Sequence, residues 1–301
     1  MPLLVRIRGL LVVAFGSRSC KHKRECCVEE LDWLILYFGT RKMPKKKAKK
    51  EKDSTVSSLS SNNKKEASDQ IPLDRLLWSP SRLAAEQHKR KPPQTDEILP
   101  GFVWVVHDFL LPEECQAWID FVDGSATSAK SKLEYVQHPA TKFVANRECF
   151  RWQRNDQQIS GALFQRMDAC GIVRELQEKA GISNANSNYN ARACNPNIRL
   201  YKYEKGMAFG KHVDGSHPVN HVGMTEVTVL IYLSDCQGGA TRFYPAVSSS
   251  RSKGKDKSIA FVPKKGALLV HIHGDRCLEH EADPVLSGVK YILRTDLVYS
   301  S

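Results

Sequence analysis

The feature that most constrains the fold is a change of pattern near residue 198, where helix-like segments give way to a series of short strands. Before it, Pro112-Glu113-Glu114 begins a segment with helical spacing of apolar residues, and Asp156 caps another that runs towards Cys170. Runs rich in β-branched and aromatic residues, separated by glycine turns, predict strands at Phe102–His107, Ile198–Tyr203, Glu226–Leu233, Thr241–Tyr244, Ile259–Val262, Ala267–His271 and Val289–Tyr299. Helices followed by many short strands predict an α+β fold with an antiparallel sandwich or barrel.

The positive charge is concentrated at the N-terminal end of the chain. Residues 1–94 hold 21 of the 45 Lys and Arg and 10 of the 33 Asp and Glu, a net charge of +11 out of +12. The remainder is almost neutral, so nucleic-acid binding is expected only through the basic tail. An apolar share of 41% excludes a wholly disordered chain, and no apolar run approaches the roughly 18 residues of a membrane span.

Composition predicts three segments. Residues 1–42 read as a targeting segment or a mis-annotated start, because Met1–Ser19 holds three arginines and no acid. Residues 43–97 read as a basic, disordered tail and linker with a short helix over Leu73–Gln87, and the folded domain spans 98–301. A start at Met43 favours the nucleus or cytoplasm. A targeting peptide over residues 1–19 favours the endoplasmic reticulum or an organelle.

The nine cysteines show no Cys-x-x-Cys pair, and the chain has no Asn-x-Ser/Thr sequence. A zinc ribbon and a thioredoxin motif are therefore not expected. Both observations favour a reducing compartment.

His212 and Asp214 are the first indication of chemistry. Residues i and i+2 of a strand point to the same face, so both side chains can reach one metal ion. A histidine from a distant strand would complete a set of two imidazoles and one carboxylate. That set leaves three coordination positions open, as non-haem Fe(II) oxygenases require.

The surrounding motifs make this pair specific. They are Tyr203-x-x-Gly206-x-x-Phe209-x-x-His212-x-Asp214, Thr228-x-Leu230-x-Tyr232-Leu233, Gly238-Gly239-x-Thr241-x-Phe243, Pro263-x-x-Gly266-Ala267-Leu268-Leu269, and His280-x3-Pro284-Val285-x2-Gly288-x-Lys290. Their order and spacing resemble the 2-oxoglutarate- and Fe(II)-dependent dioxygenases of the prolyl 4-hydroxylase alpha-subunit type, over roughly residues 98–301. The resemblance implies a double-stranded β-helix (jelly roll) with N-terminal supporting helices.

The resemblance also implies the site residues. His212, Asp214 and His280 match the family's metal ligands, and Lys290 matches the cation that holds the distal carboxylate of 2-oxoglutarate. The cosubstrate is further expected to contact Tyr232, Tyr203 and Arg294, with Thr228 assisting. The implied cofactors are Fe(II), 2-oxoglutarate, O2 and L-ascorbate as reductant, and no catalytic side chain is expected beyond the iron centre.

The implied reaction is hydroxylation of a C–H bond while 2-oxoglutarate becomes succinate and CO2. A protein side chain such as proline is the first substrate class, which makes a protein or peptide the expected partner. The alternatives are a dioxygenase acting on a small molecule or a nucleic-acid base, and a jelly-roll binding module without activity. The oligomeric state is not predicted.

Several residues keep two interpretations. His271 and His273 form a second same-face pair, either a rival source of ligands or structural side chains near the metal. His217 and His221 are expected to be exposed to solvent. The polar segment Ser125–Ala145 is expected to be an irregular loop, and Ala126–Arg151 is either a lid that brings Arg147, Arg151 and Trp152 to a substrate or a packed connector.

Overall fold

The computed structural model describes residues 3–7, 10–14, 73–79, 81–83, 93–124, 131–142, 144–182, 188–245 and 258–301. The chain divides into two compact units. The first, Met1–Asp32, holds an antiparallel hairpin of β1 (Leu3–Ile7) and β2 (Leu10–Ala14). The second, Trp33–Ser301, holds the other described elements. The predictions of a targeting segment and of a basic tail fall mostly outside the described residues.

Eight strands of the second unit pair as two antiparallel sets, which is the arrangement of a jelly roll. One set is β8 (Asn197–Tyr203), β18 (Lys290–Ser300), β11 (Gly223–Tyr232) and β15 (Leu268–Ile272), in that order of pairing. The other is β9 (Phe209–His212), β16 (Glu279–Ala282), β13 (Thr241–Tyr244) and β14 (Ile259–Phe261). The chain crosses repeatedly between the two sets, so the predicted double-stranded β-helix is confirmed.

Further strands extend this core. The long strand β6 (Arg147–Asn155) lies between β9 and β8 and joins the two sets, and β5 (Glu134–His138) pairs with its outer edge. The remaining strands are β3 (Thr95–Leu99) and β4 (Val103–Val106) beside β15, β7 (Asn190–Cys194) on β18, β10 (Pro218–Val219) on β11, and the pair β12 (Cys236–Gly238) and β17 (Val285–Gly288).

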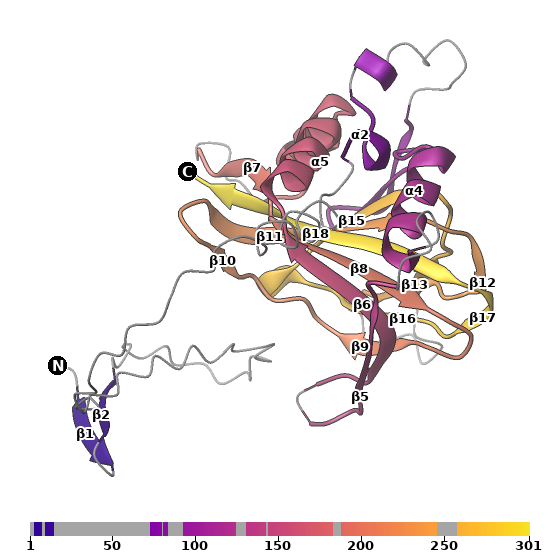
Figure 1. The fold of residues 1–301 in the computed structure, drawn as a ribbon. Coiled ribbons are helices and arrows are strands. Elements are labelled where there is room, and N and C mark those ends of the chain that lie inside the picture. The colour runs from indigo at the N-terminus through magenta and orange to yellow at the C-terminus, as the bar shows by residue number, and fades with distance from the viewer. Residues whose placement is uncertain are drawn as a thin grey trace, which may run out of the picture. The chain divides into compact units, whose positions relative to one another are not determined.

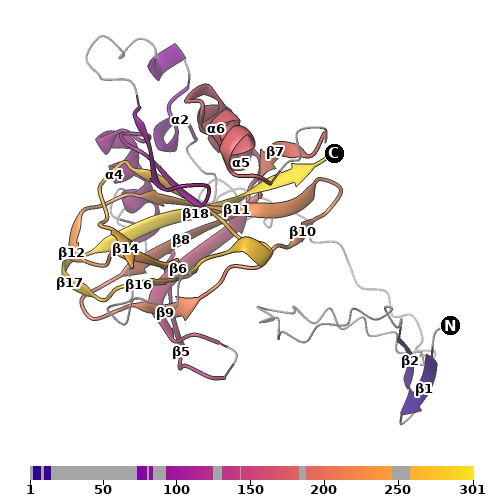
Figure 2. The same ribbon diagram turned by 180° about the vertical axis from the view of Figure 1, so that it is seen from behind.

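The helices lie together on one face of the sheet that contains β18 and β11 (Figures 1 and 2). They are α2 (Leu73–Leu76), α4 (Pro112–Asp123), α5 (Gln157–Ala169) and α6 (Ile172–Lys179), and a 3-10 turn follows later at Gly274–Arg276. Asp156 caps α5 as predicted, because its carboxylate accepts hydrogen bonds from the backbone N–H of Gln158 and Ile159. The supporting helices are therefore confirmed.

The two faces of the central strands have different neighbours. On β11, Val227, Val229 and Ile231 point into the main hydrophobic core beneath the helices. The intervening Thr228 and Leu230 line a pocket inside the roll. The same alternation on β18 sends Lys290, Ile292 and Arg294 into that pocket, which places the polar side chains on one inner surface.

One expectation from the sequence was wrong, and one expected boundary falls inside a strand. The segment Ser125–Ala145 was predicted to be an irregular loop, but it contains β5, and β6 had not been predicted. The expected domain boundary at residue 98 lies within β3, and Leu76 and Leu77 upstream are buried in the main core. The packed domain therefore includes residues that had been assigned to the linker.

Candidate metal centre

The three expected metal ligands come together where β9 and β16 meet. His212, the last residue of β9, lies directly opposite His280 in the register of the two strands. Asp214 follows two residues later and is only 2% exposed. One donor atom from each of the three side chains lies within 4.8 Å of the other two. The sequence spacing therefore places His212, Asp214 and His280 around one point.

Backbone carbonyls fix the orientation of both imidazoles. His212 Nδ1 lies 2.8 Å from the carbonyl oxygen of Gly210, and His280 Nδ1 lies 2.9 Å from that of Leu278. A carbonyl can only accept, so each Nδ1 carries the proton and each Nε2 keeps its lone pair. Burial, followed by the neighbouring His280, lowers the pKa of His212 to about 3, which keeps this ring neutral. Both rings are ready to donate to a metal.

The two oxygens of Asp214 have different roles. Oδ2 accepts a hydrogen bond from Thr228 Oγ1 at 2.7 Å and lies 2.9 Å from Arg294 Nη2. Oδ1 is buried and, among the described residues, has no hydrogen-bond partner. Burial, the largest influence, would raise the pKa of Asp214, but the Arg294 guanidinium together with the neighbouring histidines outweighs it and holds that pKa well below its ordinary value. An ionised oxygen without a partner, beside two imidazole lone pairs, fits a divalent metal ion.

Lys290 lies at the other end of the same pocket. It is 1% exposed, and its ammonium group donates a hydrogen bond to the carbonyl oxygen of Gly239 at 2.6 Å. The ring centroids of Tyr203 and Tyr232 lie 5.5 and 5.8 Å from Nζ. Within the described part of the chain this ammonium forms no ion pair, and burial lowers its pKa to about 8. A buried cation in that state fits the carboxylate of a bound ligand.

Of the other residues predicted to contact the cosubstrate, Tyr203 lies in the pocket as expected, whereas Tyr232, Arg294 and Thr228 have other partners. Tyr203 and Thr241 line the pocket, whereas the Tyr232 hydroxyl is 2.7 Å from Thr241 Oγ1. Arg294 faces the roll as expected, but it contacts Asp214 and lies 3.6 Å from Asp296 Oδ1 rather than beside Lys290. Thr228 likewise donates a hydrogen bond to the Asp214 carboxylate. Arg294 and Thr228 therefore orient Asp214.

The other histidines considered in the sequence analysis lie in different surroundings. His273 Nδ1 lies 3.0 Å from Thr228 Oγ1, so it supports the residue that holds Asp214. His271 is buried inside the roll with Nε2 3.6 Å from Asp214 Oδ2. His217 and His221 are exposed, which confirms that expectation.

Three residues had been expected to meet a substrate. Arg147 and Arg151 lie over the rings of Phe209 and Tyr201, at 5.1 and 5.8 Å from the ring centroids, and both rings line the pocket. Trp152 points the other way and packs edge-on against Phe121 at 5.5 Å, on the helix side. Only the two arginines therefore lie near the pocket.

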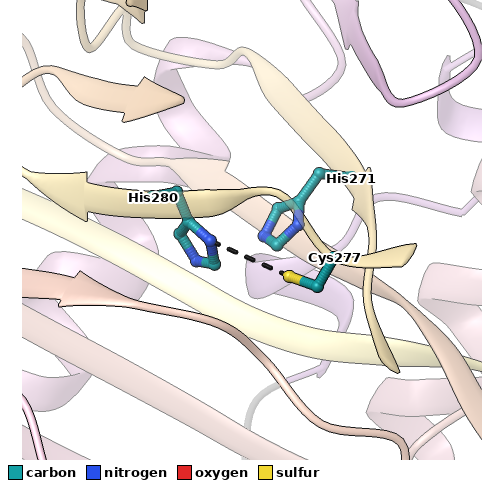
Figure 3. Close-up of side chains that lie close together, drawn as sticks. All are labelled: His271, Cys277 and His280. Atoms are coloured by element: carbon teal, nitrogen blue, oxygen red, sulfur yellow. Dashed lines mark hydrogen bonds between the residues drawn. The ribbon is translucent and has the colours of Figure 1, made fainter. Parts of the chain in front are cut away.

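Cys277 was not predicted. Its sulfur accepts a hydrogen bond from the backbone N–H of Asp214 at 3.3 Å and lies 3.9 Å from His280 Nδ1 (Figure 3). Burial raises the pKa of the Cys277 thiol to about 12. Its position three residues before His280 is the one sequence signal that could have found it.

Comparison with known proteins agrees with this geometry. Residues 198–295, about a third of the chain, match the family model described as the 2OG-Fe(II) oxygenase superfamily. That match confirms the resemblance noted in the sequence over its most specific motifs. A search of curated proteins found no match. In the described part of the chain, no helix is both long enough and apolar enough to cross a membrane.

Solved structures give distant similarities. A viral collagen prolyl hydroxylase from Paramecium bursaria Chlorella virus-1 has 16% identity and a TM-score of 0.41, covering 71% of this chain and 98% of that one. A Pseudomonas putida prolyl-4-hydroxylase has 14% identity and a TM-score of 0.41, with coverages of 73% and 98%. A Trichoplax adhaerens prolyl hydroxylase, in complex with a peptide fragment of the hypoxia inducible factor oxygen degradation domain, has 16% identity and a TM-score of 0.42, with coverages of 77% and 94%. The fold assignment rests on the strand pairings described above.

Proposed function

We propose that this chain, whose residues 198–295 match the 2OG-Fe(II) oxygenase superfamily, is an Fe(II)- and 2-oxoglutarate-dependent dioxygenase that hydroxylates a protein side chain, with proline as the first substrate. The observation that carries the proposal is one inner pocket with a prepared metal site at one end and buried Lys290 at the other. A ligand with a metal-chelating end and a distal carboxylate fits both ends.

His212, Asp214 and His280 would hold the iron from one side, which leaves its other positions open to the pocket. When bound, iron with 2-oxoglutarate and O2 supplies the oxidising chemistry, in which 2-oxoglutarate becomes succinate and CO2 and one oxygen atom enters the substrate C–H bond. Thr228 and Arg294 hold Asp214 Oδ2, so that Oδ1 faces the metal position. Phe209 stacks on the His212 ring at 3.7 Å between centroids and limits its rotation.

Lys290 would bind the distal carboxylate of 2-oxoglutarate and neutralise it in a place that water does not reach. Tyr203 and Tyr232 enclose the ammonium group, and Thr241 adds a hydroxyl to the same wall. Exclusion of water strengthens this ion pair, because the local dielectric constant is low.

A peptide substrate is supported by the sequence resemblance and by one feature of the fold. Strand β5 is mostly exposed and pairs with β6, whose Arg147 lies opposite Phe209 of the metal-binding strand. An extended peptide could add to the outer edge of this hairpin and reach the pocket mouth. Arg147 and Arg151 would then favour acidic residues beside the target.

The test is turnover of 2-oxoglutarate with Fe(II) and L-ascorbate, with and without a library of proline-containing peptides. We expect succinate to form, and a peptide to gain the mass of one oxygen atom. Succinate with hydroxylation of a small molecule or a nucleotide, but of no peptide, would refute the substrate class and keep the reaction class. Absence of succinate from iron-loaded protein with every substrate would refute both.

A further inference from the structure

A second group of side chains that could hold a metal ion also includes His280. His271, Cys277 and His280 each offer a donor atom within 4.8 Å of the other two. The centroid of the His280 ring lies 4.3 Å from that of His212 and 4.5 Å from that of His271. Figure 3 shows the imidazole of His271 and the sulfur of Cys277 facing that of His280 from neighbouring segments. The two ligand sets share one residue, His280.

The surroundings of His271 independently indicate that this side chain can bind a ligand. It is 1% exposed, and its Nε2 has no hydrogen-bond partner among the described residues. Its Nδ1 makes one long contact, 3.2 Å to the carbonyl oxygen of Ile272. An unpartnered buried nitrogen is costly, so this side chain gains when an acceptor of its lone pair binds.

We propose that His271, Cys277 and His280 form a binding site for a thiophilic divalent ion such as Zn²⁺ or Cd²⁺, and that this ion excludes iron from the neighbouring site. The donors differ in chemistry: one sulfur and two nitrogens here, against two nitrogens and a carboxylate oxygen for iron. Thiolate ligands select soft ions, whereas carboxylates suit harder ones. On binding, the Cys277 thiol loses its proton to solvent and its sulfur donates to the metal.

Exclusion follows from the single lone pair of a neutral imidazole. Iron requires His280 Nε2, which is free because Nδ1–H donates to the Leu278 carbonyl. The sulfur of Cys277 lies 3.9 Å from Nδ1, so a metal held with Cys277 uses that nitrogen instead. The proton must then move to Nε2, and the hydrogen bond to Leu278 is lost. One ring cannot serve both ions, and the competition part of this inference rests on the proposed function.

The experiment titrates metal-free protein with Cd²⁺ and, separately, with Mn²⁺ as an air-stable substitute for iron. Cadmium binding is followed by thiolate-to-metal charge-transfer absorption in the ultraviolet, and manganese binding by electron paramagnetic resonance. We expect one equivalent of Cd²⁺ to produce the band and to release bound Mn²⁺. Cys277→Ser should abolish the band and weaken Cd²⁺ binding at least about 100-fold, while Mn²⁺ affinity changes less than about threefold.

Matched variants separate the two sites. His212→Ala should lose Mn²⁺ and keep the cadmium band, His280→Ala should lose both, and Cys170→Ser, distant in the fold, should change neither. Circular dichroism checks that each variant is folded. His271→Gln is a second variant that should lose the cadmium band. The proposal is overturned if the band persists in Cys277→Ser, if Cd²⁺ and Mn²⁺ bind together, or if Cys277→Ser weakens both ions equally. If the wild-type protein shows the cadmium band but does not bind Mn²⁺, the iron site and the exclusion of iron are refuted and the cadmium site stands.

Discussion

At the scale of single residues, the candidate metal site is defined by which nitrogen and oxygen atoms already have a hydrogen-bond partner. The carbonyls of Gly210 and Leu278 take one nitrogen of each imidazole, and Thr228 with Arg294 takes one oxygen of Asp214. What remains is two lone pairs and one carboxylate oxygen, all directed to one position. His280 differs from His271 in that its donor atom lies within 4.8 Å of donor atoms of both His212 and Asp214.

Replacing these two histidines separately tests that distinction. His280→Ala should abolish Fe(II) binding, measured by equilibrium dialysis, because it removes a donor of the iron set. His271→Ala should change Fe(II) affinity by no more than about 10-fold, the lower range for groups outside the ligand set. Loss of iron by the His271 variant and retention by the His280 variant would exchange the two assignments.

The proposed contact of Lys290 with the distal carboxylate makes 2-oxoglutarate binding dependent on charge. Loss of one partner of a buried ion pair costs about 3–5 kcal/mol, and 1.4 kcal/mol is about tenfold. Lys290→Ala should therefore raise the dissociation constant of 2-oxoglutarate about 100-fold or more in anaerobic titrations, with iron affinity unchanged. The exposed Lys264→Ala is the matched control. Equal effects of the two variants would remove Lys290 from the site.

The same residue gives a pH dependence with a definite sign. Burial lowers the pKa of Lys290 to about 8, so the ammonium group of the free protein loses its proton as the pH rises through that value. Only the charged form pairs with a carboxylate. The dissociation constant of 2-oxoglutarate should therefore stay constant below about pH 8 and rise up to about tenfold per pH unit above it. Lys290→Met should lack this break, and a wild-type profile without one would contradict the assignment.

At the scale of elements, period two explains why much of the site could be predicted. Strands such as β11 and β18 read directly as alternating apolar and polar residues, and the metal motif lies at a strand end. Strand β6 was missed because its sequence, RECFRWQRN, is rich in charge and lacks aliphatic residues. Its partners β9 and β8 are distant in sequence, and pairing with them decides its conformation.

Gly266 forms backbone hydrogen bonds with Tyr232 at the end of strand β11 and with Leu110 just before helix α4. Its φ is +83°, its N–H donates to the Tyr232 carbonyl, and an added Cβ would lie 2.5 Å from the Leu110 carbonyl oxygen. Gly266→Ala should therefore lower the free energy of unfolding by more than the roughly 1–2 kcal/mol of a left-handed residue alone.

The matched control is Gly161→Ala in helix α5, where an added Cβ meets nothing within 4 Å. It should raise the free energy of unfolding by about 0.5–1 kcal/mol. Urea unfolding measures both variants. A destabilising Gly161→Ala together with a neutral Gly266→Ala would contradict this account of the two glycines.

At the scale of the whole molecule, the chemistry lies in the almost neutral part of the chain, but the packed domain begins earlier than charge suggests. Leu76 and Leu77 enter the main core, and the backbone N–H of Trp78 donates to buried Glu114 at 2.7 Å. Composition could not reveal this, because two leucines in a polar segment give no sign that they pack into a core formed by residues distant in the sequence.

Two fragments test the domain boundary. Residues 72–301 should fold and bind iron, since they keep both leucines. Residues 93–301 should lose about 3–6 kcal/mol of unfolding free energy, because each buried leucine contributes about 1.5–3 kcal/mol. Denaturant titration compares them. Equal stability would show that the segment around Leu76 is dispensable.

In the proposed function, one pocket binds iron and 2-oxoglutarate together. The most direct test adds 2-oxoglutarate anaerobically to Fe(II)-loaded protein and records the visible charge-transfer absorption of a keto acid chelated to Fe(II). We predict a band that saturates at one iron and one 2-oxoglutarate per chain, disappears in Asp214→Ala, and requires far more 2-oxoglutarate in Lys290→Ala. Iron-loaded protein that shows no band, or an undiminished band in Asp214→Ala, would contradict the central claim.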